Sequence, residues 1–263
     1  MSFKDIIFTK EGPIATILLN RPGSFNALNL GIAEDMAKAL EICEKDREIR
    51  VVVLTGNGKS FCSGGDIKSF EEYAGTEPDK PIRQLLDVFH RVILDIRKMP
   101  KPVLAAINGA TGGAGISLAL ACDLRIASAL AKFKLAFTSL GLTPDSGSTL
   151  FLGLMVGFAR TSEMIFLDPV YDAEQALAMG LVHKVVEHDR LMEATRQWAE
   201  QLAAGATRSF AAGKVNLNHA FLTLLERQLE IERRNVLKSS LTSDYQEGLE
   251  AFLTKRKAVF KGC

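Results

Sequence analysis

The first part of the chain alternates short apolar runs with amphipathic segments. Residues 6–20 hold two β-rich runs, and the turn-forming sequence Glu-Gly-Pro at 11–13 joins them, which predicts a hairpin. Residues 31–45 and 82–98 carry apolar side chains at helical spacing with charged residues between them, so each predicts an amphipathic helix.

Two further runs are apolar without alternation, and a third, shorter run follows them. Residues 51–56 and 102–109 are continuous apolar segments that end at glycine, a pattern typical of strands buried on both faces, and 124–128 predicts another short strand. Residues 112–122 read as a helix that is apolar nearly all round and therefore central. This alternation of strands and helices predicts an α/β fold.

The C-terminal part has a different pattern. The predicted strands stop near residue 190, and helical periodicity continues through 191–204, 208–238 and 244–257. We therefore expect a core over residues 1–190 and a helical region over 191–263. Such a helical region packs either on its own core or on a neighbouring subunit.

Composition narrows the class of protein. The 32 basic and 31 acidic residues nearly balance, so no nucleic-acid partner is expected. The four cysteines have no metal-ligand or disulfide-framework spacing, and the histidines form no ligand spacing, so no metal site is expected. Charges flank the apolar run near the N-terminus, and the apolar stretch at 150–159 is too short for a bilayer. We expect a soluble cytoplasmic protein with no membrane partner.

Two glycine-rich segments carry the candidate chemistry. The segment at 60–70 contains Gly64 and Gly65 soon after a predicted strand, and the segment at 107–123 places four glycines where a helix begins. Glycine allows close approach to a ligand, and the first amides of a helix have no internal partner. Neither segment has the spacing of a nucleotide-phosphate loop. The segments indicate either two amides that converge on one oxygen, as in an oxyanion hole, or ordinary tight turns.

Longer motifs resemble a known family. LNRP at 19–22 with NALN at 26–29, FCSGGDIK at 61–68, and PKPVLAAINGATGGAGISLALACDLRIAS at 100–128 are similar to the crotonase superfamily of enoyl-CoA hydratases and isomerases. GLTPDSGSTLFL at 141–152 and the ending at 243–262 match as well. The resemblance implies a spiral core of repeated ββα turns, C-terminal helices used in trimerisation, homotrimers or homohexamers, and acyl-CoA thioester substrates. It implies no cofactor beyond the coenzyme A of the substrate.

The resemblance also implies roles for individual residues. The main-chain amides of Gly65 and Ala114 correspond to the oxyanion pair, with Ala114 replacing the more common glycine. Further positions correspond to the path of the coenzyme A moiety and its phosphates: Asn26, Ala27, Gly64, Asp66, Ile67, Lys68, Phe252 and Lys255. From the residues alone, the basic run 255–257 is more typical of a solvated surface.

The expected reaction follows from which acids are present. Family hydratases use two glutamates, and the corresponding positions here are Ser117 and Phe137. Between residues 109 and 166 the only acids are Asp123, Asp145 and Glu163. Asp145 follows a proline in a loop that feeds a helix, where its alternative role is a helix N-cap. Apolar neighbours are expected to raise its pKa into the range useful for proton transfer. One carboxylate suffices for a double-bond shift, so we expect an enoyl-CoA isomerase.

Other functions stay open at this level. An enoyl-CoA hydratase for an unusual acyl group is one. A 4-chlorobenzoyl-CoA dehalogenase or acyl-CoA hydrolase is another. The dehalogenase branch of the family is similar in having a histidine at the position of His90 and an aspartate at the position of Asp145. That branch differs in having tryptophan where this chain has Phe137 and a bulkier aromatic residue where it has Gly65. A catalytically silent acyl-CoA-binding or RNA-associated homologue is a third. The polar segment 71–85 is either a loop over the acyl pocket or a surface linker.

Overall fold

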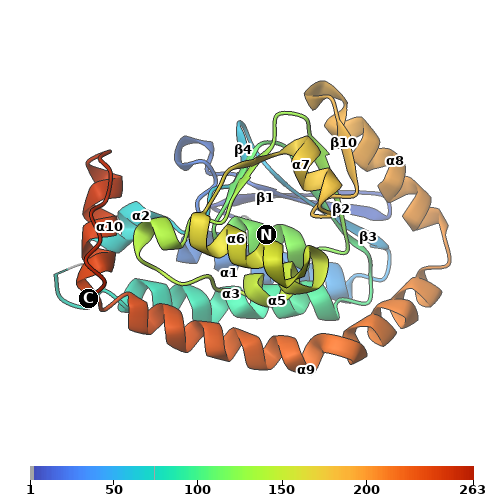
Figure 1. Cartoon of the computed structure of the whole chain (residues 1–263). Helices are drawn as coiled ribbons and strands as arrows, with labels where there is room; N and C mark the ends of the chain where they lie inside the picture. Colours follow the sequence, from blue (N-terminus) through green and yellow to red (C-terminus); the bar gives the residue numbers. More distant parts are fainter. Residues whose placement is uncertain (1–2, 74) are drawn as a thin grey trace.

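A computed structural model describes residues 3–73 and 75–263. Its larger sheet has six strands in the order β1-β2-β3-β5-β7-β10 (Figure 1). β1 and β2 form the predicted antiparallel hairpin, and the remaining pairs are parallel. The bounds are β1 (Ile6–Glu11), β2 (Ile14–Leu19), β3 (Val51–Gly56), β5 (Val103–Ile107), β7 (Leu124–Ser128) and β10 (Lys184–Val186).

The continuous apolar runs are explained by burial on both faces of this sheet. On β3, Val52 and Leu54 belong to the main core, whereas Val51 and Val53 pack in a second core under α8 (Leu191–Ala204). The main core is covered by α1 (Leu30–Lys45) and α3 (Lys80–Lys98), which pack on each other. A polar residue at any of these strand positions would therefore be buried without a partner.

A smaller sheet carries the glycine-rich turns. Its order is β4-β6-β8-β9, with the first three strands parallel and β9 antiparallel. The bounds are β4 (Ser60–Cys62), β6 (Ala110–Gly112), β8 (Lys132–Lys134) and β9 (Tyr171–Asp172). Because β4 and β6 are adjacent, the turns that follow them lie side by side. β6 was not predicted, and the helix expected at 112–122 begins after it, as α4 (Ala114–Ala121).

The remaining helices enclose the site or line the outside. They are α2 (Ile67–Glu71), α5 (Ser148–Met155), α6 (Gly157–Leu167), α7 (Ala173–Ala178), α9 (Thr207–Ser239) and α10 (Ser243–Leu253). Figure 1 shows α9 running the length of the molecule below α3 and α5, with α10 at its end near α2. Among the described residues, no helix combines the length and apolar character needed to cross a membrane.

Two predicted boundaries are corrected. The C-terminal helix ends at Leu253 instead of 257, because the chain turns back and Arg256 pairs with Glu247 at 2.5 Å. The segment 71–85 is neither a continuous loop nor a plain linker, since α3 already begins at Lys80 and its Ile82 and Leu85 reach the main core. Residue 74 of that segment, and residues 1 and 2 of the N-terminal stretch, lie outside the described residues.

Candidate active site

Two glycine turns form one wall of the site. Gly64 follows β4 with φ 104°, and Gly113 follows β6 with φ 49°. A Cβ atom on Gly64 would lie 3.2 Å from the Gly112 carbonyl oxygen, and one on Gly113 would lie 3.3 Å from Gly64 Cα. The two turns therefore touch, and both the backbone conformation and the contact require glycine.

The next amide after each turn is available to a ligand. Gly65 and Ala114 both line the same cavity. Leu28 and Gly65 form an isolated β-bridge that uses the Gly64 carbonyl and the Asp66 amide, and Ala114 is the first residue of α4. Within the described part of the chain, neither the Gly65 nor the Ala114 N–H donates a hydrogen bond. Such amides suit an oxygen that gains negative charge.

Asp145 lies on the same cavity, in the turn before α5. Its side chain is 6% exposed, and burial raises its pKa to about 7. The Ser146 hydroxyl donates to its Oδ1 at 2.8 Å, which opposes this shift, and the negative charge of Glu232 adds to it. Asp145 does not cap α5 with its side chain, because the cap residue is Gly147. A carboxyl group with a pKa near neutrality can both accept and return a proton.

The cavity has a volume of about 670 Å³ and a mostly apolar wall. One helix face supplies much of that wall, and the loop before Asp145 supplies the rest. The apolar side chains are Phe70, Ile82, Leu85, Leu86, Phe89, Phe137, Leu140, Leu142 and Val236. This wall keeps Asp145 away from water and suits a hydrocarbon acyl group.

The mouth of the cavity is basic. Lys68, Lys134 and Lys255 line it beside the half-exposed Phe252. Lys134 pairs with Asp168 at 3.3 Å, whereas Lys68 and Lys255 form no ion pair among the described residues. Free ammonium groups next to an exposed ring suit a phosphate-bearing nucleotide.

Most of the residues singled out in the sequence line this cavity. They are Ala27, Gly64, Gly65, Asp66, Ile67, Lys68, Ala114, Phe137, Asp145, Phe252 and Lys255. Asp66 is not free, because it pairs with Arg21 at 2.8 Å, and Arg21 also donates to the Ala27 carbonyl. This ion pair fastens the turn at 23–27 to the start of α2.

Three sequence-selected residues lie outside the cavity lining. Asn26 is fully buried and donates to the carbonyls of Asn57 and Ser60, so it shapes the backbone. Ser117 donates to the Asp145 carbonyl at 3.0 Å, so it holds the turn from the α4 side. His90 is one residue beyond the lining residue Phe89.

The His90 ring is poorly placed to act as a base at neutral pH. Burial and the nearby Arg233 charge lower its pKa to about 4. Its Nε2 atom is buried and has no hydrogen-bond partner among the described residues. Asp87, on the same helix, pairs with Arg233 at 2.5 Å, and among the described residues no hydrogen bond joins it to the imidazole.

The sequence did not single out Glu232, a buried residue that contacts the backbone just after Asp145. It comes from α9, more than eighty positions after Asp145, and binds the first turn of α5. One available signal was its place in the apolar stripe of α9, between Leu229 and Val236.

A cluster of three or more side chains able to bind a metal does not occur among residues 3–73 and 75–263.

Comparisons with known proteins agree with this geometry. A family model described as enoyl-CoA hydratase/isomerase matches residues 9–263. The chain is 36% identical to 1,2-epoxyphenylacetyl-CoA isomerase of Escherichia coli over 253 residues, which cover 96% of each chain. It is 33% identical to short-chain-enoyl-CoA hydratase of Clostridium acetobutylicum over 258 residues, covering 98% of this chain and 97% of that protein.

Solved structures give the same result for the fold. A crystal structure of an enoyl-CoA hydratase from Mycobacterium avium subsp. paratuberculosis superimposes with a TM-score of 0.89 at 31% identity, covering 99% of this chain and all of that one. The predicted fold class, with its C-terminal helices, is confirmed.

Proposed function

Because the chain belongs to the enoyl-CoA hydratase/isomerase family and is an enzyme of that family, we propose that it shifts a double bond in an enoyl-CoA. One observation carries the proposal. Of the acidic residues that line the cavity, Asp66 is paired with Arg21, and Asp145 is the remaining carboxyl group. It is buried, has a pKa of about 7, and lies on the cavity that the free amides of Gly65 and Ala114 share.

The proposed mechanism uses these three groups. The thioester oxygen of a 3-enoyl-CoA accepts hydrogen bonds from the Gly65 and Ala114 amides. Ionised Asp145 removes a proton from C2, and the electron pair moves onto the thioester oxygen to form a dienolate. Asp145 then returns the proton to C4, which leaves the double bond between C2 and C3. Two main-chain donors contribute roughly 3–4 kcal/mol each to the stability of such an oxyanion.

The carrier is proposed to be coenzyme A. Lys68 and Lys255 place ammonium groups at the cavity mouth, where the phosphates of the nucleotide would lie, and Phe252 offers a ring for the adenine. The apolar side chains deeper in the cavity contact the acyl group.

Hydration is the second candidate, because several relatives are named hydratases. Adding water calls for a second group that positions the water molecule. Phe137 is apolar, and the Ser117 hydroxyl already donates to the Asp145 carbonyl. The dehalogenase alternative calls for a histidine base, and His90 is outside the cavity lining with a lowered pKa.

A panel of acyl-CoAs, followed by mass spectrometry and chromatography, tests the proposal. We expect a 3-enoyl-CoA to isomerise without change of mass, and Asp145→Asn to abolish turnover while retaining acyl-CoA binding. A gain of one water by a 2-enoyl-CoA without any isomerisation would support the hydratase instead. Release of chloride from 4-chlorobenzoyl-CoA would support the dehalogenase, and binding without turnover would support the silent homologue.

A further inference from the structure

Three polar side chains interrupt the buried stripe of α9. Lys214, Asn218 and Glu232 share this face with Leu225, Leu229 and Val236. A charged residue in such a stripe is costly unless its partners satisfy it. Each of the three has partners, and these partners belong to two separate parts of the core.

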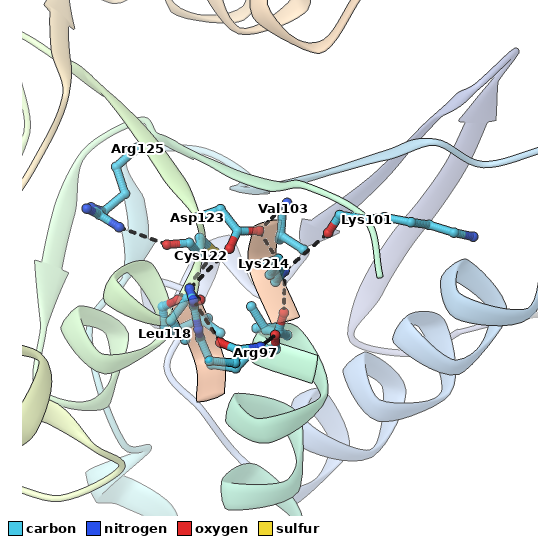
Figure 2. Close-up of polar contacts among 11 residues, drawn as sticks. Arg97, Lys101, Val103, Leu118, Cys122, Asp123, Arg125 and Lys214 are labelled. Carbon is cyan, nitrogen blue, oxygen red and sulfur yellow. Dashed lines mark hydrogen bonds and ion pairs between the residues drawn. The ribbon is translucent and has the colours of Figure 1, made fainter. Parts of the chain in front are cut away.

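The first two residues fasten α9 near its start. Lys214 donates to the Asp123 carboxylate at 2.6 Å and to the carbonyls of Ile96 and Lys101. Asn218 exchanges hydrogen bonds with Arg97, which also pairs with Asp123 at 3.1 Å. Figure 2 shows Asp123 at the centre of this cluster, between Arg97 and Lys214. The contacts fix both the rotation and the axial position of α9.

Helix geometry carries that register to the active site. Glu232 comes 18 residues after Lys214. At 3.6 residues per turn this is five full turns, so the two side chains lie on the same face, roughly 27 Å apart along the axis. The contacts of Lys214 fix the register of α9, and this register places Glu232 at the start of α5.

Glu232 binds the backbone that follows Asp145. One carboxylate oxygen accepts from the Gly147 amide at 2.6 Å, and the other accepts from the Thr149 amide at 3.1 Å and from the Thr149 hydroxyl. Gln228, one turn earlier on α9, donates to the same hydroxyl at 2.8 Å. Glu232 is 3% exposed; its bond to the Gly147 amide is buried, and its bonds to Thr149 are partly buried.

The turn that Glu232 holds is a strained one. Ser146 has φ 57° and Gly147 has φ 84°, two consecutive left-handed residues directly after Asp145. For serine this conformation costs on the order of 1 kcal/mol or more and persists only when its surroundings enforce it. Glu232 on α9 holds the turn through its hydrogen bonds to Gly147 and Thr149. Ser117 on α4 holds it through a hydrogen bond to the Asp145 carbonyl.

We infer that Glu232 is the positioning residue of Asp145: by clamping Gly147 and Thr149 it fixes the left-handed turn that aims the Asp145 carboxyl group into the cavity. The role rests on the proposed function in so far as Asp145 is the acid/base. Glu232 does not line the cavity, so it acts through Asp145.

The charge of Glu232 has a second effect on the same group. It is a buried negative neighbour of Asp145 and raises the pKa of that carboxyl group. The hydroxyl of Ser146 acts in the opposite direction. Removing the Glu232 charge should therefore lower the pKa of Asp145, an effect that loss of a purely structural hydrogen bond elsewhere in the fold would not produce.

The test compares Glu232→Gln with Glu230→Gln, a matched change two residues away on the exposed face of α9. We expect Glu232→Gln to lower kcat for the double-bond shift by about 10- to 100-fold, the scale of a small misplacement of a reacting group. KM should change by less than about threefold, and the pH at half-maximal kcat/KM should move to lower pH. Glu230→Gln should match the wild type.

A readout without turnover separates this inference from the proposed function. Carbon-13 NMR titration follows the Asp145 carboxyl signal, which is identified by its loss in Asp145→Asn. A lowered pKa in Glu232→Gln supports the inference even if the wild type isomerises nothing, which would refute only the proposed function. An unchanged Asp145 pKa in Glu232→Gln would overturn the inference. Wild-type kcat and a wild-type pH profile in that variant would overturn it as well.

Thr149→Val covers the case in which Glu232→Gln fails to fold. It removes one donor to Glu232 and leaves the carboxylate in place. We expect kcat to fall by about 3- to 10-fold with the Asp145 pKa retained. Unchanged kcat in a folded Thr149→Val protein would contradict the clamp.

Discussion

The Ser146 hydroxyl donates a 2.8 Å hydrogen bond to the carboxylate of its neighbour Asp145, although Ser146 itself occupies left-handed backbone. This conformation places the hydroxyl and the carboxylate on the same side of the chain. The bond leaves the second carboxylate oxygen of Asp145 with no hydrogen-bond donor among the described residues. The arrangement orients one oxygen and leaves the other open to accept the substrate proton in the proposed mechanism.

The pH dependence of activity follows from the raised pKa of Asp145. The pKa is about 7 in the folded enzyme, compared with 3.8 for an unperturbed aspartate. The proposed first step needs the ionised form, so kcat/KM should fall as the pH drops through about 7. A stopped-assay profile between pH 5 and 9 measures this limb. A profile that is flat down to about pH 5 would contradict the assignment of Asp145 as the base.

The pH dependence of stability has the opposite sign. Between about pH 4 and 7 the folded Asp145 holds a proton that the unfolded chain has lost, so stability decreases as the pH rises through this window. The upper bound on the change is on the order of 4 kcal/mol. Asp145→Asn keeps the shape and removes the charge. It should be more stable than the wild type in urea at pH 8, with a difference that shrinks below pH 6. An equal difference at both pH values would be inconsistent with a raised pKa.

The turn at Gly64 should not tolerate a side chain. Gly64→Ala places a Cβ in left-handed backbone and 3.2 Å from the Gly112 carbonyl oxygen. We expect a loss of roughly 1–3 kcal/mol in unfolding free energy and a large drop in kcat, because the Gly65 amide shifts. Gly213→Ala, in an open position on α9, is the control and should be neutral or slightly stabilising. Wild-type melting and turnover in Gly64→Ala would refute the close contact of the two turns.

The cluster around Asp123 should govern stability (Figure 2). Lys214→Met removes a buried ammonium group from the partly buried Asp123 carboxylate, which still pairs with Arg97, so the cost should be at most the roughly 3–5 kcal/mol typical of a broken buried pair. Lys98→Met is the control, since its partner Glu226 and Lys98 itself are both about half exposed, and such pairs are worth less than about 1 kcal/mol. Urea unfolding measures both variants. Equal effects would show that Asp123 is adequately satisfied without Lys214.

The surface of α6 bears on assembly. Phe158 is 86% exposed and Phe166 is 78% exposed, and monomers rarely leave large apolar side chains so open on one helix. We predict a homotrimer or homohexamer in sedimentation, which Phe158→Ser with Phe166→Ser would dissociate. A wild-type monomer at micromolar concentration would contradict this.

Elements with a continuous or periodic pattern were predictable from the sequence. The run at 51–56 was read as a buried strand, and all six positions of β3 are buried. The strands of the smaller sheet were not predicted, although the glycine turns that follow β4 and β6 were. β4, β6 and β8 have three residues each, which is too short for a period to appear.

The site was predictable where the backbone chemistry was local. Gly64 and Gly65 predicted a turn, and Asp145 was one of three acids between residues 109 and 166, selected because it follows a proline in a loop before a helix. The position of Glu232 was not predictable, because it depends on the register of α9. Hydrogen bonds between Lys214 and residues more than one hundred positions earlier set that register. Asn26 was selected from its motif, but its hydrogen bonds to the carbonyls of Asn57 and Ser60 depend on how the chain folds and were not predictable.

In the proposed mechanism a single carboxyl group moves a proton between two carbons of an enolate held by two amides. Proton NMR of a 3-enoyl-CoA incubated with the wild type and with Asp145→Asn tests it most directly. We predict that the vinyl signals of the 2-enoyl-CoA appear with the wild type, and that Asp145→Asn is at least about a thousandfold slower. Hydration of a 2-enoyl-CoA with no change in the 3-enoyl signals, or full activity in Asp145→Asn, would rule out this proton transfer by Asp145.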